Sequence, residues 1–562
     1  MKHGSFRTVF ILFAFAGLLA TAIVAQPPAS LIKDEKSSSI KAQLEIAKTA
    51  ERKSDFQAAT DAYNRILKID PHNYQAHTGI NNIGKNGLLR AYQENPGFGS
   101  DEKVMKELSD KLTTEAAAKQ AKYEKLAKDN PTKAVYQLIL ANNNAYEPVK
   151  MQEYLYEAQR LEPNNPDVLR MLAQFEKLKG NNAIAAELYK RLSDLDPQDE
   201  DAAFAYYYSL SDVDHEQFKE KTQEFIKRFP KSERGASLLY QIASKGDEAE
   251  KVAYLEKLKS TYPPDKNQTS MSGMSDLFSM YLHSSPDKAL TFAREMLASA
   301  SERGKTEWQG YIDFLTGYKQ AESLIKDNRT ADALQMLEKI KLPSRSSGAR
   351  EATVKFNLLK SAAQAAGGQT EAAYEGLKTF YVKSPSDEVR SELTKLGKAI
   401  GRKESQIEND IQTGVSGLAK PFKDFSLALY DQDKTVSLAD YRGKVVLLNF
   451  WYPLCGPCHA EAPYIQKLVE KYGKDKFVVL APNAFPNQDS LVVPFFNGNK
   501  YDFIPLKVPD SEYLKNEYQI RGYPTNYLID KKGNRVFETG NVSPERLRQI
   551  ELMVEMLLAQ QW

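Results

Sequence analysis

The sequence predicts a multi-domain protein in which an N-terminal α-solenoid of paired helices precedes an α/β domain. Its 562 residues are too many for one hydrophobic core. Prolines recur at nearly constant intervals through a long helix-favouring region. After about residue 417, short strand-like runs alternate with helical ones, which is typical of an α/β sheet.

The overall composition is that of an ordinary soluble protein. Hydrophobic residues make up 42% of the chain and charged residues 27%. The 76 basic and 74 acidic side chains leave a formal charge of +2. Such a balance gives no reason to expect nucleic acid as a partner.

The first 25 residues have the pattern of a secretory signal. Lys2 and Arg7 precede an uncharged apolar run, residues 9–25, whose end is rich in small residues. We therefore expect export to a periplasmic or other extracytoplasmic location. Residues 1–25 are predicted to be a cleaved signal peptide, with an uncleaved N-terminal anchor as the alternative.

Residues 41–400 are predicted to form helix after helix, because Ala, Leu, Lys and Glu recur at helical spacing. Pro131, Pro163, Pro197, Pro230 and Pro263 are separated by 32, 34, 33 and 33 residues. A period near 34, with a proline closing each helix pair, is typical of tetratricopeptide repeats. Such arrays build concave surfaces that bind peptides or proteins, so we expect this region to bind a protein partner.

Two segments carry the finer repeat pattern. In each, a small residue lets paired helices approach and an aromatic residue four positions later fills the gap: Ala59 and Tyr63 before Pro71, and Ala185 and Tyr189 before Pro197. Gly180 is expected in the turn between two paired helices. Stretches near 80–125 and 265–345 match poorly, so the array is predicted to be degenerate.

The C-terminal region changes in character. Residues 401–416, charged and containing glycine, are predicted to be a linker, and residues 417–562 a separate domain. Strands are predicted at residues 425–429, 435–438, 444–451, 477–480, 526–530 and 535–539. Helices are predicted at residues 461–472, in an insert after residue 480, and at residues 544–558.

The two cysteines of the chain, Cys455 and Cys458, stand where the predicted strand 444–451 passes into a helix. Exported proteins that use disulfides as staples usually carry several, widely spaced. A closed loop this small would add only about 2 kcal/mol of stability. The N–H groups and partial positive charge of a helix N-terminus favour a thiolate on the first cysteine. We therefore predict a redox-active disulfide in which Cys455 is the nucleophile and Cys458 resolves the mixed disulfide.

The region from 422 to about 548 resembles the TlpA-like, redoxin branch of the thioredoxin superfamily. The matching motifs are residues 424–427, residues 438–451, Cys455-Gly456-Pro457-Cys458 with Glu461 and Pro463, and Gly522-Tyr523-Pro524-Thr525 before residues 528–530. The resemblance implies a thioredoxin fold for residues 417–562. It also implies a cis bond between Tyr523 and Pro524 beside the redox pair, which makes Pro524 a candidate catalytic residue.

The same resemblance suggests roles for neighbouring residues. Trp451, Gly456, Pro457 and Tyr523 are expected to line the substrate groove. Glu461 stands where this branch often has an acidic residue implicated in proton handling, and we predict an assisting catalytic role, with a solvated helix-face glutamate as the alternative. Asn449 takes the place of a buried aspartate in cytosolic thioredoxins. Residues 452–454 depart from the usual lead-in of the family, which affects the expected substrate preference and not the redox chemistry.

Three other uses of the cysteine pair are less consistent with the sequence. Cys-x-x-Cys-His is also the attachment signature of c-type haem, but haem attachment requires neither the apolar strand before the pair nor the motif at 522–525. A zinc site needs about four ligands, and His459 is the sole histidine after residue 283. The threonine-preceded cysteine of the related peroxidases is absent. No cofactor and no metal are therefore predicted.

The sequence predicts an exported thiol–disulfide oxidoreductase. Gly456-Pro457 between the cysteines resembles the dipeptide of reducing members of the superfamily, which implies a reductant of protein disulfides. The expected partners are a protein disulfide substrate and a protein bound by the repeats, and the resemblance to exported reductants of this branch implies a membrane electron-donor protein as well. The alternative is an interaction scaffold whose redox domain is inactive or senses redox state. The sequence does not identify the client, the electron donor or the oligomeric state.

Overall fold

The structure, a computed structural model, describes residues 35–300, 302–343 and 347–561, and these form two compact units. The first unit contains the described residues up to Lys221 together with Phe485–Lys500 and Asp510–Glu512. The second contains Thr222–Ala484, Tyr501–Pro509 and the residues from Tyr513 onwards. The predicted signal, residues 1–25, lies outside the described residues. The domain boundaries expected above stay a prediction.

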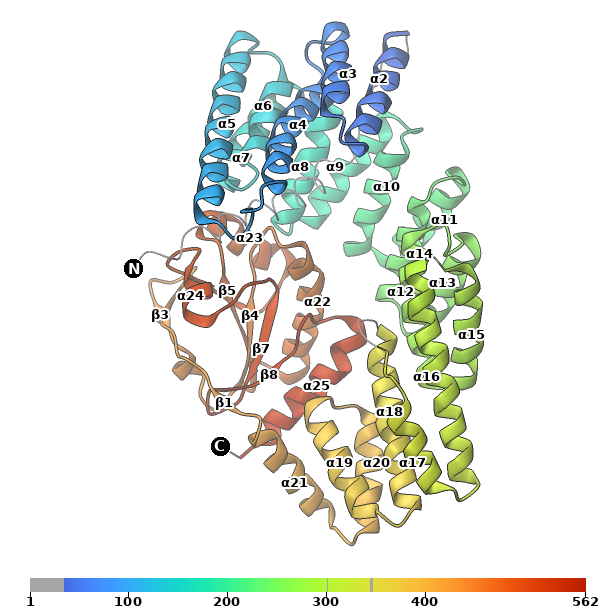
Figure 1. Ribbon diagram of the computed structural model, residues 1–562. Coiled ribbons are helices and arrows are strands. Elements are labelled where there is room, and N and C mark those ends of the chain that lie inside the picture. Colours follow the sequence, from blue (N-terminus) through green and yellow to red (C-terminus); the bar gives the residue numbers. More distant parts are fainter. Residues whose placement is uncertain (1–34, 301, 344–346, 562) are drawn as a thin grey trace. The chain divides into compact units, whose positions relative to one another are not determined.

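The first unit is helical (Figure 1). Its helices along the chain are α2 (Glu35–Arg52), α3 (Phe56–Ile69), α4 (Tyr74–Gln93), α5 (Glu102–Asp129), α6 (Ala134–Asn143), α7 (Pro148–Leu161), α8 (Pro166–Leu178), α9 (Asn182–Leu195), α10 (Glu200–Ser209) and the short η1 (Leu210–Asp212). It also includes α23 (Asp489–Asn499), which comes from the C-terminal region. The chain passes to the second unit within α11 (His215–Arg228).

The second unit begins with further helices and ends with a sheet. Its helical part contains α12 (Arg234–Lys245), α13 (Glu248–Thr261), α14 (Gln268–Ser284), α15 (Pro286–Ser299), α16 (Glu302–Lys326), α17 (Thr330–Lys339), α18 (Ser347–Ala366), α19 (Thr370–Lys383), α20 (Asp387–Ala399) and α21 (Glu404–Ser416). In the described residues, no helix is both long and apolar enough to cross a membrane.

The regularly spaced prolines mark helix ends. Each of the five stands two positions after the last residue of a helix, following α5, α7, α9, α11 and α13. Proline has no N–H to continue the helical hydrogen bonds, which explains why the interval predicts these boundaries. The poorly matching stretches contain the long helices α5 and α16, of 28 and 25 residues.

The predicted packing of paired helices is also present. Tyr63 in α3 is 5% exposed, and its ring faces Gly79 of α4 so closely that a Cβ at Gly79 would lie 2.3 Å from the ring. Gly180 joins α8 to α9 with a φ of +77°, a conformation that glycine adopts without steric cost. The aromatic residue and the turn glycine therefore have the positions expected of helical repeats.

The C-terminal region forms an eight-stranded mixed sheet in the order β1-β8-β7-β4-β5-β6-β2-β3. The strands are β1 (Lys420–Pro421), β2 (Leu427–Leu429), β3 (Thr435–Val436), β4 (Val445–Phe450), β5 (Phe477–Asn483), β6 (Ile504–Lys507), β7 (Thr525–Ile529) and β8 (Asn534–Glu538). Central β4 pairs in parallel with β5 and antiparallel with β7. The accompanying helices are η2 (Leu438–Tyr441), α22 (Gly456–Tyr472), η3 (Pro486–Gln488), α24 (Tyr513–Tyr518) and α25 (Pro544–Ala559).

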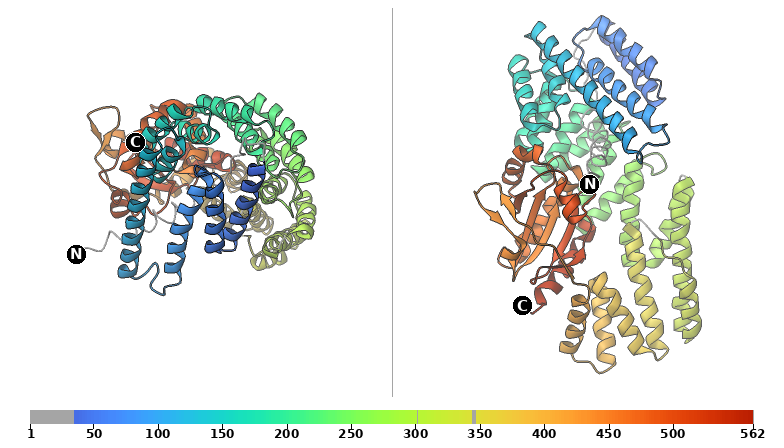
Figure 2. Two further views of the ribbon diagram at one scale, coloured as in Figure 1. Left: turned by 90° about the horizontal axis from the view of Figure 1, so that it is seen from above. Right: turned by 60° about the vertical axis from the view of Figure 1, so that its left-hand side comes forward.

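Helix α25 packs against both the sheet and the helical part of the second unit (Figures 1 and 2). Its buried residues are Ile550, Leu552, Met553, Val554, Met556 and Leu557. Polar contacts with the helical part are Lys251 to Glu545 at 2.5 Å, Arg548 to Asp387 at 2.7 Å, Gln549 to Ser384 at 3.0 Å and Gln412 to the carbonyl of Met556 at 3.3 Å. Because α25 is buried on more than one side, its apolar residues need both the sheet and the helical part to shield them from water.

Helix α23 makes a comparable contact inside the first unit. A Cβ on Gly498 would lie 2.7 Å from the backbone of Gly180, so the two backbones touch. The amide of Asn182 donates to Oδ1 of Asn499 at 2.9 Å, and Asn487 donates to the carbonyl of Tyr146 at 2.8 Å. The helical repeats of this unit are thus closely packed against a segment inserted between β5 and β6 of the sheet domain.

We expect the apolar burial of α25 to contribute more stability than its ion pair with the helical part. Leu557→Ala should lower the free energy of unfolding by about 2–5 kcal/mol, because the side chain is fully buried. Asp387→Ala should cost less than about 1 kcal/mol, because Asp387 and Arg548 are 61% and 49% exposed. Urea unfolding of the two variants measures both values, and equal losses would contradict this account.

Candidate active site

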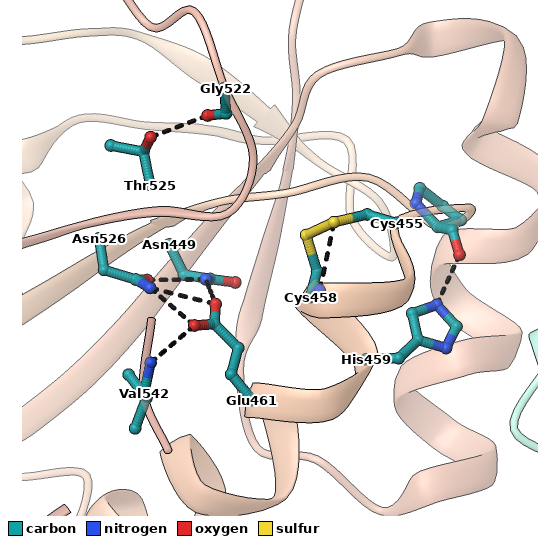
Figure 3. Close-up of a disulfide and its surroundings, with 10 residues drawn as sticks. Asn449, Cys455, Cys458, His459, Glu461, Gly522, Thr525, Asn526 and Val542 are labelled. Atoms are coloured by element: carbon teal, nitrogen blue, oxygen red, sulfur yellow. Dashed lines mark hydrogen bonds between the residues drawn. A yellow bond between two sulfur atoms is a disulfide. The ribbon is translucent and has the colours of Figure 1, made fainter. Parts of the chain in front are cut away.

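The redox pair lies where β4 ends and α22 begins. All six residues of β4 are buried, and the chain leaves the sheet through Trp451 before reaching the helix. Cys455 is the N-cap residue of α22, and a disulfide joins it to Cys458 in the first turn (Figure 3). The Cys458 N–H donates to Sγ of Cys455 at 3.2 Å. This N–H and the helix N-terminus both favour negative charge on Cys455 once the disulfide is reduced.

Trp451 is an internal anchor of this junction. The indole N–H donates to the carbonyl of Ala481 at 3.2 Å, and the side chain is 2% exposed. Its backbone continues the pairing with β5, accepting from the N–H of Ala484 at 2.8 Å. These contacts fix the direction in which the chain leaves the sheet. Trp451 therefore determines where the following cysteines lie.

The other expected groove residues lie on two segments. Gly456 and Pro457 are exposed at the start of α22, and a Cβ at Gly456 would meet nothing within 4 Å. On the second segment the Tyr523–Pro524 peptide bond is cis, which confirms the expectation from the family. The Tyr523 ring packs edge-on against Tyr452, with centroids 5.4 Å apart. Pro524 is partly buried, directly before β7.

Glu461 is buried next to the redox pair and surrounded by neutral hydrogen-bond donors. It is 2% exposed, so the alternative of a solvated glutamate is wrong. Its carboxylate accepts from Asn449 at 2.7 Å, from Asn526 at 2.9 and 3.1 Å, and from the Val542 N–H at 2.9 Å. Burial raises the pKa of Glu461 to about 7, although the hydrogen bonds from Val542, Asn526 and Asn449 act in the opposite direction. The group can therefore hold or release a proton near neutral pH.

Two residues of this site were not singled out from the sequence. Asn526 is fully buried in β7 and contacts both Glu461 and Asn449. The one available signal was a polar residue in an otherwise apolar buried strand, directly after Pro524-Thr525. His459 was considered only as a metal ligand. Its Nε2 lies 2.5 Å from the carbonyl oxygen of Pro453, in the loop before Cys455.

One group of metal-ligand side chains occurs elsewhere in the described residues. His283, Glu351 and Glu388 bring ligand atoms within 4.8 Å of one another on the helical part. The ammonium of Lys355 lies 2.8 Å from Glu388 and 3.8 Å from Glu351. A cation of the chain itself therefore already pairs with both carboxylates.

The chain is similar in sequence to several known proteins. Residues 418–535 match the AhpC/TSA family. The chain is 37% identical over 110 residues to the thioredoxin-like protein YneN of Bacillus subtilis (strain 168), covering 20% of this chain and 64% of YneN. It is 32% identical over 120 residues to the thiol-disulfide oxidoreductase ResA of Bacillus thuringiensis subsp. konkukian (strain 97-27), covering 21% of this chain and 68% of ResA. A solved thiol:disulfide interchange protein of the thioredoxin family from Chlorobium tepidum TLS is 25% identical, with a TM-score of 0.22, covering 25% of this chain and 97% of that one.

A central strand that leads into a helix capped by a disulfide-linked Cys-x-x-Cys, beside a cis-proline, defines a thioredoxin-like redox domain. Through this domain the chain belongs to the AhpC/TSA family, in the group of thioredoxin-like proteins that includes the thiol-disulfide oxidoreductases ResA. The chain spans about 64% of the length of the first relatives, and the match covers about a fifth of this chain. The helical region lies outside it.

The buried carboxyl group predicts a pH-dependent stability. The pKa of Glu461 is about 7 in the folded chain and 4.5 for an ordinary glutamate, so the folded chain retains a proton that the unfolded chain releases. The stabilisation that the protonated Glu461 adds to the free energy of unfolding is fully present below pH 4.5 and is lost as the pH rises through 7. The loss is on the order of 3 kcal/mol, at about 1.4 kcal/mol per pKa unit.

Glu461→Gln should remove this dependence, because glutamine does not titrate. Between pH 4.5 and 8 we expect the free energy of unfolding of the variant to rise relative to that of the wild type. Urea unfolding at a series of pH values measures this difference. Glu470→Gln, at an exposed position of the same helix, is the control and should run parallel to the wild type. Parallel curves for Glu461→Gln would contradict the burial of an ionisable group.

Proposed function

We propose that this chain is an exported thiol–disulfide oxidoreductase that reduces disulfide bonds of a client protein. The observation that carries the proposal is the position of Cys455 at the N-cap of α22, joined to Cys458 and supported by its N–H. This arrangement favours a thiolate on Cys455, at the N-terminus of the helix. Attack on a disulfide requires a thiolate.

The reaction transfers two electrons and needs no cofactor. The Cys455 thiolate attacks one sulfur of the client disulfide, so that a mixed disulfide forms and the other client sulfur leaves as a thiolate. Cys458 loses its proton and attacks Sγ of Cys455, which releases the second client thiolate. The client is reduced to a dithiol and the chain is oxidised to the Cys455–Cys458 disulfide. A dithiol donor then reverses this oxidation.

Glu461 is the candidate acceptor of the proton that Cys458 must lose. It lies one helical turn after Cys458, on the Cys458 side of the disulfide in Figure 3. A pKa near 7 allows the carboxylate to take up a proton at neutral pH and to release it again. Pro524 and Tyr523 lie on the loop before β7, where we place the client chain together with exposed Gly456 and Pro457.

Export and reducing direction are supported by the sequence. The N-terminal 25 residues have the pattern of a secretory signal, and Gly456-Pro457 resembles the dipeptide of reducing members of the superfamily. An exported reductant needs electrons from outside its own compartment. A membrane protein that presents a dithiol to Cys455–Cys458 is the proposed donor.

For the helical region we propose binding of the client or of a partner protein, because helical repeats present extended surfaces. The packing of α23 and α25 adds a second role. Repeat helices contact both segments, so they also hold parts of the redox domain in place. An interaction scaffold with an inactive redox domain remains the alternative function.

Cysteine variants test the proposed chemistry. Cys455→Ser should reduce disulfide-reductase activity to background, because it removes the nucleophile. Cys458→Ser should accumulate mixed disulfides with the client, because nothing resolves the first intermediate. Non-reducing gels followed by mass spectrometry detect these adducts. A Cys458→Ser chain that turned over freely would contradict the assigned roles.

The double variant Cys455→Ser/Cys458→Ser separates the enzyme from the scaffold. It retains every surface of the helical region and lacks only the redox chemistry. Expressed in place of the wild type, it should fail to restore the reduced state of the client if the chain is an enzyme. Full restoration of the wild-type phenotype would favour the scaffold.

A further inference from the structure

Asn526 forms hydrogen bonds with three segments around the active site: with Glu461 on α22, with Asn449 on β4 and with Gly540 after β8 (Figure 3). It is fully buried in β7, two positions after Pro524. Its amide nitrogen lies 2.9 and 3.1 Å from the two carboxylate oxygens of Glu461 and 3.2 Å from the carbonyl of Gly540. Its amide oxygen accepts from Asn449 at 2.8 Å. No other side chain among the described residues donates to both oxygens of Glu461.

Among the described residues, the groups that act on the pKa of Glu461 are neutral hydrogen-bond donors. From β4 the carboxylate faces Asn449, from β7 it faces Asn526, and from the segment after β8 it faces the Val542 N–H. On its own helix Cys458 stands three residues before Glu461, and the ring of His459, two residues before it, contacts the carbonyl of Pro453 on the side away from the carboxylate (Figure 3). Burial and hydrogen bonds alone account for the shifted pKa of Glu461. The amides therefore determine both where the carboxylate points and how readily it ionises.

We propose that Asn526 is a positioning residue for the redox reaction, holding the carboxylate of Glu461 as the proton acceptor for Cys458. The proposal rests on the function proposed above and assigns a role to a residue outside the Cys-x-x-Cys and Tyr-Pro-Thr motifs. Asn449 supports the same carboxylate from the other side, but it reaches only Oε1. Asn526 also connects Glu461 to the strand that follows the cis-proline, so the proton acceptor and that loop are held by one side chain.

Replacing the amide with a hydrocarbon should make Glu461 harder to ionise. Asn526→Leu retains similar volume and removes the donor to both carboxylate oxygens, which disfavours the charged form and raises the pKa of Glu461. A hydrogen bond to a charged group contributes enough to move the midpoint of a pH profile upward by about one pH unit. At pH 7 the ionised fraction, and with it a step that depends on this base, should fall about fivefold.

A two-phase reaction isolates the step in question. Reduced full-length protein is mixed with excess aromatic disulfide 5,5′-dithiobis(2-nitrobenzoate). Attack by Cys455 releases the first coloured thiolate, and attack by Cys458 on the mixed disulfide releases the second. In Asn526→Leu we expect the second phase to be about fivefold slower at pH 7, with its pH midpoint shifted upward. The midpoint of the first phase should stay unchanged.

Two further variants distinguish positioning from a structural role. Tyr527→Phe removes a hydroxyl from the same strand, on a side chain that interacts with Arg535 and not with Glu461, and should move neither midpoint. In a Glu461→Gln background, Asn526→Leu should produce no further shift, because the group that it positions no longer titrates. Equal slowing of both phases, or an unmoved second midpoint, would overturn the proposal.

Folding of the variants is checked by circular dichroism. If Asn526→Leu fails to fold, Asn526→Ser gives the same midpoint test, because its short hydroxyl cannot reach both carboxylate oxygens. If neither variant folds, Asn526 is required for the structure and the positioning role is wrong. A wild-type protein that releases neither thiolate would instead refute the proposed function itself, since that result precedes any effect of Asn526.

Discussion

The junction between β4 and α22 is the constraint on which the rest of the site depends. Because β4 is a buried central strand, its end is fixed by β5 on one side and β7 on the other. The end of β5 anchors Trp451, and the start of β7 brings Pro524 and Asn526 to the same edge of the sheet. Helix α22 must begin there, which places Cys455 where unpaired N–H groups favour a thiolate. The sheet thus supplies the nucleophile, the cis-proline loop and the buried carboxyl group together.

The parts of the site that sequence reasoning predicted are those with local signals. A continuous apolar run predicted β4, the cysteine spacing predicted the disulfide, and the resemblance predicted the cis bond at Pro524. The burial of Glu461 and its contact with Asn526 are formed between residues 65 positions apart, and no local pattern encodes such a pairing. Strand β6 was not predicted, because Pro505 within Ile504–Lys507 counts against a strand. In the structure the pairing with β5 accommodates this proline.

In the helical region, too, local features could be predicted from the sequence and long-range contacts could not. The prolines correctly predicted where helices end, since proline stops a helix by its own chemistry. The contacts of α23 and α25 with repeat helices depend on apolar surfaces whose partners are distant in the sequence. Residues 401–416, expected as a linker, contain helix α21 with Ile407, Ile411 and Val415 buried. Removing residues 41–400 would therefore strip the cover from α25 as well as remove the proposed binding surface. Point variants are the better means of separating the two roles.

The central claim is that Cys455 and Cys458 form a reversible, reducing redox pair. A redox titration of residues 26–562 in dithiothreitol and glutathione buffers, followed by thiol alkylation and gel shift, tests this claim directly. The account predicts a single two-electron transition near the value of thioredoxin, about −270 mV. A transition near about −120 mV, typical of a strong oxidant, would reverse the proposed direction. Absence of any reversible transition would contradict the enzymatic function.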